Sequence, residues 1–331
     1  MKHAIRTAAA FALASLLCSG ASAEIVTFEI PAFGIEPASI NNKGELTGYY
    51  LDEYGEHGFL WQPDGTLTSF DVTDAERTDP AGISPEGVIT GQYYTPNSTG
   101  GFVRAADGSI TTFNVRHVSV TEVNGVNAKG WSVGEYLHRP HGPPGPFLRS
   151  PFGATTKFTV PGATGGAIAV AVNRSRMIAG EALIHHKYEN RGFIRTPDGT
   201  ATLFGDPAFF TSVRAMNDTG TVTGWMNQQQ FYEGFVRTVD GTMTTFAGPN
   251  GAMATLALAI NKSGTVAGGY ADSHEGTYHG FLRTADGTFT PFNVAGSYST
   301  TITAINDKGA IAGIYQETDG FSRYRVFVGK P

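Results

Sequence analysis

The sequence is poor in cysteine. Its single cysteine, Cys18, falls within the first 23 residues, and residues 24–331 contain none. That longer part of the chain therefore has no disulfide, no cysteine nucleophile and no cysteine metal ligand. A lipid anchor on Cys18 would need a small residue just before it, but Leu17 stands there. Stability must come from packing and hydrogen bonding.

The first 23 residues have the organisation of a secretory leader. Lys2 and Arg6 form a basic start, residues 8–17 form a short apolar run, and Ala21-Ser22-Ala23 has the small residues of a cleavage site. The apolar run is too short to span a bilayer as a helix. We therefore expect a signal peptide at residues 1–23, cleavage near Ala23, and a secreted or periplasmic protein.

Long apolar runs and an excess of basic residues are also missing. Apart from the leader, no apolar stretch is long enough to cross a membrane, and the formal net charge is −6. Nucleic-acid binding needs a basic surface, so this acidic balance argues against a nucleic-acid partner. The sequence also lacks the nucleophile elbow, the phosphate-binding glycine loop and the His-Glu-x-x-His motif. We expect no cofactor, and we expect a monomer with one large domain at residues 24–331.

What the sequence does contain is a repeat. Three residue series recur seven times each, and the successive members of each series lie 42 to 46 residues apart. The first series is Phe28, Phe70, Phe113, Phe158, Phe204, Phe246 and Phe292. The second is Gly48, Gly91, Gly134, Gly180, Gly224, Gly268 and Gly313. The third is Phe59, Phe102, Phe147, Phe193, Phe235, Phe281 and Phe327. A period of this length indicates a repeat architecture.

Each repeat is typical of four short strands. Residues 254–292 predict strands at 255–260, 265–270, 279–283 and 288–292. A turn at Asn261 separates the first two strands, and an Asp286-Gly287 hairpin turn separates the last two. Related turn residues recur in the other repeats, so we interpret them as structural. Calcium binding is a weaker interpretation, because one Asp in each turn supplies too few oxygen ligands.

Four antiparallel strands repeated seven times predict an all-β fold, a seven-bladed β-propeller. The last repeat lacks its fourth strand, and residues 25–30 at the N-terminus have the pattern of that missing strand. We therefore expect the N-terminal strand to complete the last blade, which would pair the exposed edges at both chain ends.

The repeats resemble the HAF family of extracellular repeats, named for a His-Ala-Phe motif. The corresponding positions here are His57-Gly58-Phe59 and His279-Gly280-Phe281, and the motif degrades in other repeats, as at Arg191-Gly192-Phe193. The resemblance covers essentially all of residues 24–331. It implies export and a repeat fold, and it transfers no catalytic residue. Because the His is absent from several repeats, we expect it to have a packing or turn role.

The loops that join the second and third strands of each blade differ sharply in composition. They share one face with the crossovers between blades, and variable loops on a rigid scaffold commonly carry function. Four histidines in adjacent blades are candidate metal ligands: His138, His141, His185 and His186. The alternative, solvated loop histidines, stays open.

A second set of candidates lies where the first strand of each blade begins. The position five residues before the Asn turn is acidic in three consecutive blades, as Glu36, Asp79 and Glu122, and Arg214 lies two residues further along in blade five. These groups could bind a cation or a sugar, or form an acid/base pair with one raised pKa. The alternative is that the carboxylates are simply solvated.

Aromatic residues on the same face suggest a third kind of site. Trp225, Tyr188, Tyr232, Tyr278 and Tyr54 lie in these loops or beside them, near Asn and Gln residues. Apolar stacking together with neutral hydrogen bonds is the chemistry of a carbohydrate or peptide binder. Equally, these rings could cap the blade edges.

Three hypotheses follow. The first is an exported binding module for a carbohydrate or protein ligand on the loop face, with Trp225, Tyr232, Tyr188, Tyr278 and Arg214 as contacts. The second is a lyase or hydrolase that uses His185 or His186 with Glu36, Asp79 or Glu122. The third is a structural envelope protein. A fold alone does not choose between them.

Overall fold

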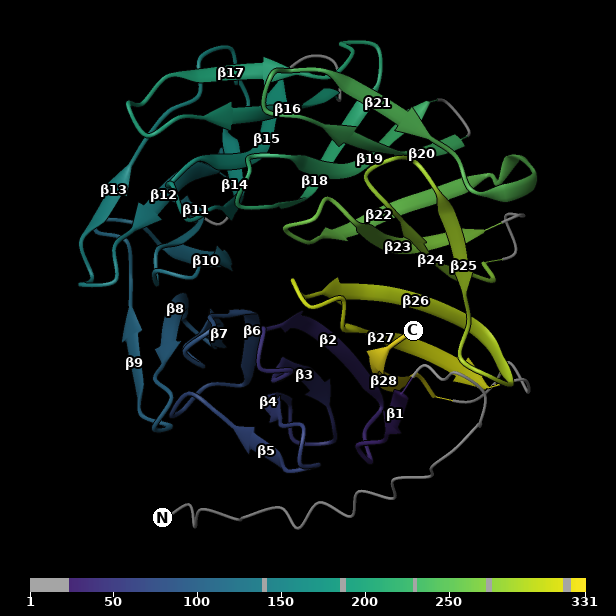
Figure 1. The fold of residues 1–331 in the computed structure, drawn as a ribbon. Helices are drawn as coiled ribbons and strands as arrows, with labels where there is room; N and C mark the ends of the chain where they lie inside the picture. The colour runs from purple at the N-terminus through teal and green to yellow at the C-terminus, as the bar shows by residue number, and fades with distance from the viewer. Residues whose placement is uncertain (1–23, 139–141, 185–188, 229–230, 272–275, 318–322) are drawn as a thin grey trace.

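The computed structural model describes residues 24–138, 142–184, 189–228, 231–271, 276–317 and 323–331. Their regular structure is almost entirely β-strand, with a short 3-10 turn, η1 (Pro249–Gly251). Figure 1 shows the strands gathered in groups around the centre of the molecule. No helix in these residues is long and apolar enough to cross a membrane.

The described strands fall into seven groups of four, which we call units 1 to 7. Unit 1 contains β2 (Gly34–Ile40), β3 (Leu46–Leu51), β4 (Glu56–Trp61) and β5 (Leu67–Phe70). Unit 2 contains β6 (Arg77–Ile83), β7 (Ile89–Thr95), β8 (Ser98–Arg104) and β9 (Ile110–Phe113). Unit 3 contains β10 (Val120–Val126), β11 (Ser132–Leu137), β12 (Gly145–Arg149) and β13 (Thr155–Lys157).

The remaining units follow the same plan. Unit 4 contains β14 (Ala167–Val172), β15 (Ile178–Ile184), β16 (Glu189–Arg195) and β17 (Ala201–Phe204). Unit 5 contains β18 (Phe210–Met216), β19 (Val222–Gln228), β20 (Phe231–Arg237) and β21 (Met243–Phe246). Unit 6 contains β22 (Ala254–Ile260), β23 (Val266–Ala271), β24 (His279–Arg283) and β25 (Phe289–Phe292). Unit 7 contains β26 (Ser297–Ile305), β27 (Ile311–Glu317), β28 (Arg325–Lys330) and the N-terminal β1 (Glu24–Phe28).

Within each unit the four strands pair in order and antiparallel. In unit 7, β1 pairs with β28 over the register Glu24↔Lys330 to Phe28↔Val326. Single parallel residue pairs, such as Glu56↔Arg77, join some neighbouring units, so the strands form four separate sheets. Strand pairing therefore does not run continuously around the molecule. Unit 6 matches the sequence prediction for 254–292 to within one residue at each strand end.

Every unit has the same irregularity in its first strand. The register between the first and second strands skips one residue, which is a β-bulge. Bulges redirect side chains and are common beside functional sites. The skipped residues all line one central cavity; they are Ala38, Ala81, Asn124, Val170, Arg214, Leu258 and Thr303.

Beside the bulge, a backbone carbonyl group of the first strand comes very close to the second strand, and this close approach requires the repeated glycine. A Cβ added to Gly268 would lie 1.9 Å from the carbonyl oxygen of Leu256, the residue just before Ala257, which pairs with Gly268 in the first strand. The equivalent distance is 1.9 to 2.1 Å in the other units. No side chain fits in that space, so the glycine series belongs to the scaffold.

The two phenylalanine series pack against each other between units. Each phenylalanine of the third strand is fully buried, as Phe102 and Phe235 illustrate. The fourth-strand phenylalanine of one unit meets the third-strand phenylalanine of the next: Phe70 contacts Phe102 with ring centroids 6.2 Å apart. The same contact joins unit 7 to unit 1, where Phe28 and Phe59 are 6.3 Å apart. Aromatic pairs thus connect the units in series.

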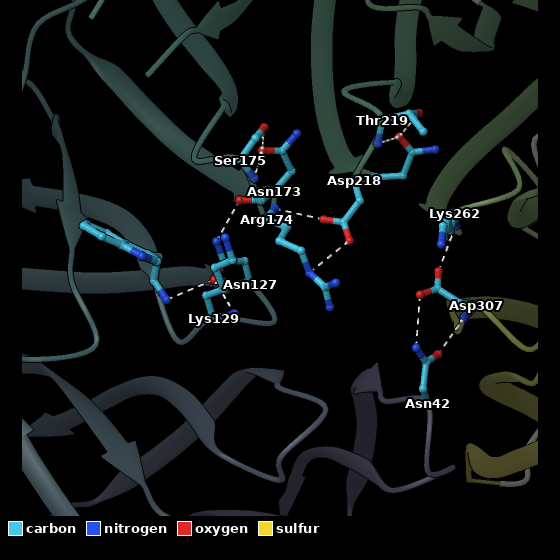
Figure 2. A network of polar contacts seen from close by, with 12 residues as sticks. Asn42, Asn127, Lys129, Asn173, Arg174, Ser175, Asp218, Thr219, Lys262 and Asp307 are labelled. Atoms are coloured by element: carbon cyan, nitrogen blue, oxygen red, sulfur yellow. Dashed lines mark hydrogen bonds and ion pairs between the residues drawn. The ribbon is translucent and has the colours of Figure 1, made fainter. Parts of the chain in front are cut away.

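The buried Asn turns add polar links between units, and Figure 2 shows part of this network. The Asn127 side chain accepts two backbone N–H groups of its own turn and donates to the Asn173 carbonyl oxygen of the next unit, at 2.7 Å. Between unit 7 and unit 1, Asn306 donates to the Asn41 carbonyl at 2.8 Å. The last unit therefore contacts the first through these turns. In unit 4 this link is missing, because the buried Asn173 Nδ2 has no partner among the described residues.

Candidate functional site

A cavity lies at the centre of the molecule, where the first strands begin. Its volume is about 620 Å³, and all seven units contribute to its wall. The bulge residues line it, together with the ends of the first two strands of several units. The charged and hydrogen-bonding side chains in its lining include Glu36, Tyr49, Arg77, Asp79, Gln92, Tyr94, Glu135, Glu181 and Arg214.

The structure brings together most of the acidic set expected from the sequence. Glu36 and Asp79 line the cavity, and Glu122 pairs in register with Glu135, which also lines it. Glu36 accepts a hydrogen bond from the Tyr49 hydroxyl at 2.6 Å. The three acids thus lie along the rim in units 1 to 3.

Asp79 is the most buried of these acids, with 7% of its surface exposed. Its Oδ2 accepts from Arg77 Nη2 at 3.3 Å, and Arg77 Nε donates to Glu56 at 2.6 Å. Its Oδ1 receives no hydrogen bond from the described residues. Burial, together with the neighbouring Glu56 carboxylate, raises the pKa of Asp79 to about 7 against the opposing effect of Arg77. Asp79 can therefore hold a proton near neutral pH.

Glu135 has the same property in unit 3. Burial is the main cause, and the carboxylates of Glu122 and Glu181 add to it, so that the pKa of Glu135 rises to about 8. Glu122 and Glu135 are direct cross-strand neighbours and are in hydrogen-bonding contact. Like charges at such a position repel, which favours the protonated form of Glu135.

Glu181 connects unit 4 to unit 5. Its Oε1 accepts from the Ser212 hydroxyl at 2.9 Å and from the Val213 backbone N–H at 3.1 Å, and its Oε2 accepts from Asn190 at 3.1 Å. Burial raises its pKa, while these hydrogen bonds lower it. Gln92 makes the equivalent link from unit 2 to the Val123 N–H of unit 3.

Arg214 occupies the bulge of unit 5 and is exposed in the cavity. Its positive charge lowers the pKa of Glu181, so the two side chains interact across the wall. In the part of the chain that the structure describes, Arg214 has no hydrogen bond or ion pair. Its guanidinium is therefore available to a ligand.

Three of the predicted aromatic contacts form one cluster beside this wall. Trp225 stacks on Phe210 with ring centroids 5.6 Å apart and meets Tyr232 edge-on at 5.3 Å. Tyr232 also raises the pKa of Tyr278 electrostatically, second to burial, so Tyr278 lies within electrostatic range of this aromatic pair. Trp225 lies opposite Ser212, the hydroxyl of which donates to Glu181. The aromatic cluster thus adjoins the acidic wall.

The histidine candidates have a different outcome. His141, His185, His186 and Tyr188 lie outside the described residues. His138 is exposed, and its Nδ1 is 3.1 Å from the His117 carbonyl oxygen. No three His, Cys, Asp or Glu side chains within the described ranges are arranged to hold a metal ion.

The histidines of the HAF-like motif contact polar residues that directly follow the fourth strand of their unit. His57 contacts Asp71 through Nδ1 at 2.9 Å and Asp52 through Nε2 at 3.1 Å. His279 contacts Asn293 through Nδ1 at 3.2 Å. Asp71 and Asn293 each follow the last phenylalanine of a fourth strand. These contacts agree with a packing or turn role.

Of the second half of the site, sequence reasoning named only Trp225. The residue after each repeated glycine lies directly opposite the rim position of the first strand, as Tyr49 does to Glu36 and Glu135 does to Glu122. In unit order these residues are Tyr49, Gln92, Glu135, Glu181, Trp225, Gly269 and Ile314. Reading one place beyond the glycine series would have found them. At this second-strand position units 2 to 4 carry polar or acidic side chains, whereas unit 5 carries a tryptophan and units 6 and 7 carry Gly269 and Ile314.

Comparison with known proteins points to the fold. A scan of known protein families found no match, and neither did a search of curated proteins. Among solved structures, a catalytically inactive virginiamycin B lyase from Staphylococcus aureus with quinupristin is 12% identical, with a TM-score of 0.61, and the match covers 94% of this chain and 100% of that one. Oligogalacturonate lyase in complex with manganese is 10% identical, with a TM-score of 0.61, over 93% of each chain.

A third similar structure is the β-propeller domain of the trilobed protease from Pyrococcus furiosus, which has an open velcro topology. It is 12% identical, with a TM-score of 0.57, and the match covers 91% of this chain and 94% of that one. At these identities the likeness concerns architecture alone. The chain therefore has an all-β, propeller-like architecture built from repeats.

Proposed function

We propose that this protein is an exported seven-bladed β-propeller, completed by its N-terminal strand, that binds an oligosaccharide at the mouth of its central cavity. Seven four-stranded units, the β1–β28 pairing and the contacts between units 7 and 1 support the closed ring. Export rests on the leader-like residues 1–23, and the resemblance to HAF repeats agrees with it.

The division of the cavity rim is the observation that carries the proposed function. Units 1 to 4 line the cavity with carboxyl oxygens and amides that can hydrogen-bond sugar hydroxyls. Unit 5 places the Trp225 ring, with Phe210 and Tyr232 around it, directly opposite the rim residue Ser212. A sugar has one apolar ring face and a polar rim, so it needs both kinds of contact. A cavity of about 620 Å³ is within the usual range for small-ligand sites.

The test is a glycan array probed with residues 24–331, followed by calorimetry on the glycans retained. Trp225→Ala should weaken binding about tenfold or more, the size expected for losing a buried aromatic anchor. Phe152→Ala is the matched control, because Phe152 is 97% exposed in a turn between third and fourth strands. An array without any retained glycan, or equal binding by Trp225→Ala, would contradict the proposal.

A lyase or hydrolase is the second candidate, and it is favoured by the raised pKa of Asp79 and of Glu135. Carboxyl groups that titrate near neutral pH are suited to general acid or base catalysis. The test is mass spectrometry of glycans incubated with the protein. Products that form with the native protein and with Glu86→Gln, but not with Asp79→Asn, would support catalysis. Intact glycans would leave binding as the function.

A further inference from the structure

The acidic half of the rim holds more carboxyl groups than cations. The cavity is lined by Glu36, Asp79, Glu135 and Glu181, with Glu56 and Glu122 in contact with them. Of the two cations in the lining, Arg77 is already engaged by Glu56 and Asp79. Arg214 interacts with Glu181 from the neighbouring unit. Glu122 and Glu135 have no cationic partner among the described residues.

The arrangement of the carboxyl groups is costly for an empty site. Glu122 and Glu135 are directly opposite on paired strands, where like charges destabilise a sheet. Asp79 contacts Glu56 in the adjacent unit. Arg77 lies beside the Asp79–Glu56 pair, whereas the Glu122–Glu135 pair has no cation beside it among the described residues, so a bound cation would relieve its repulsion.

Asp79 supplies an independent sign of a missing partner. Asp79 lines the cavity, its side chain is 10% exposed, and its Oδ1 receives no hydrogen bond from the described residues. A buried acceptor without a donor is expensive, so such atoms usually have a partner. The partner missing here is a hydrogen-bond donor, and beside this many carboxylates a positively charged donor fits best.

We propose that the bound oligosaccharide carries free amino groups, and that their ammonium ions lie against the wall formed by Asp79, Glu122 and Glu135 while a sugar ring stacks on Trp225. This inference rests on the proposed carbohydrate binding. An ammonium group donates hydrogen bonds in several directions and needs no fixed coordination geometry. A metal ion does need one, and the described residues contain no suitable set of three ligands.

The first experiment compares three oligosaccharides of equal length by calorimetry near neutral pH: glucosamine hexamer, N-acetylglucosamine hexamer and cellohexaose. The glucosamine hexamer should bind about tenfold tighter or more, the worth of a charge-assisted hydrogen bond. Equal binding of all three would overturn the amino-sugar proposal and leave carbohydrate binding intact. If none bound, the proposed function itself would fail. Calcium or manganese ions binding alone, with no glucosamine binding, would also overturn the amino-sugar proposal.

The second experiment assigns the preference to the wall. Glu135→Gln and Glu122→Gln should each lower the ratio of glucosamine to N-acetylglucosamine affinity about tenfold. Glu86→Gln, in an exposed tight turn between a first and a second strand, should leave that ratio unchanged. If a wall variant fails to fold, Asp79→Asn provides the same test. A ratio that stays constant in all folded wall variants would contradict the assignment.

Proton release gives a further readout. The groups that face Asp79 are Glu56, Arg77, Tyr49 and Tyr94, and those that face Glu135 are Glu122 and Glu181. An ammonium ion that takes the place of the proton on Asp79 or on Glu135 releases that proton. Calorimetry near neutral pH in buffers of different ionisation enthalpy should therefore show net proton release with the glucosamine hexamer. Release of equal size with cellohexaose would contradict the mechanism.

Discussion

One backbone carbonyl oxygen in each unit explains why the repeated position in the second strand is always glycine. In every unit, the carbonyl oxygen at the rim position of the first strand stands where the Cβ of any residue other than glycine would lie. The bulge that brings this carbonyl close also turns the next side chains into the cavity. One local distortion therefore explains both the glycine series and the lining of the site.

The glycine requirement predicts a clear stability effect. Gly268→Ala should lower the free energy of unfolding by about 1–3 kcal/mol, because overpacking forces backbone shifts. Gly34→Ala is the matched control, since a Cβ there meets no atom within 4 Å. Urea unfolding of both variants measures the difference. Equal stabilities would show that strand β22 can move away at no cost.

Between elements, side chains of one unit satisfy backbone groups of the next. Asn306 does this from unit 7 to unit 1, and Glu181 does it from unit 4 to unit 5. The contacts occur at both ends of the first strands, so a unit has its full set of hydrogen bonds only beside its neighbours. This is the interdependence expected of repeat units.

The turn link between the last and first units can be tested alone. Asn306→Ser keeps an oxygen for its own turn, as Ser84 does in unit 2, but loses the donor to the Asn41 carbonyl. The loss should be about 1 kcal/mol of unfolding free energy. Asn173→Ser is the control, because Asn173 Nδ2 has no partner among the described residues. Equal effects in urea unfolding would argue against the closing contact.

The sequence predicted strands well because turn residues and alternation are local signals. Strand ends in unit 6 agree to within one residue, and Asn and Asp-Gly turns occur where they were expected. The rim acids were also found, because they repeat in register. Glu135 and Glu181 were missed because their role depends on which residues of other strands lie beside them. The alternation of apolar and polar residues along one strand does not reveal such neighbours or the raised pKa that they cause.

At the scale of the whole molecule, two carboxyl groups at the cavity rim bind protons more tightly in the folded chain than in the unfolded chain. Asp79 and Glu135 have folded-state pKa values of about 7 and about 8, whereas unfolded carboxyl groups titrate near pH 4. The folded chain therefore binds more protons than the unfolded chain between these values, and its stability falls as the pH rises through them.

This linkage predicts the direction of a pH series. The contribution of Asp79 and Glu135 to stability is fully present below about pH 4 and is lost progressively as the pH rises through about 7 and about 8. Urea unfolding at about pH 5 and about pH 8 should show lower stability at the higher pH from these two groups. The double variant Asp79→Asn/Glu135→Gln should show a smaller change, while Glu86→Gln should keep the native one. An unchanged slope in the double variant would remove these carboxyls from the explanation.

The central claim, that a sugar binds between the acidic wall and the aromatic cluster, is tested most directly at Trp225. The chain has three tryptophans, so Trp61→Phe/Trp131→Phe leaves Trp225 as the only one. Titration of this variant with the oligosaccharides that bind by calorimetry should change the Trp225 emission along the same saturation curve. A ligand that binds by calorimetry while the Trp225 emission stays constant would contradict the account.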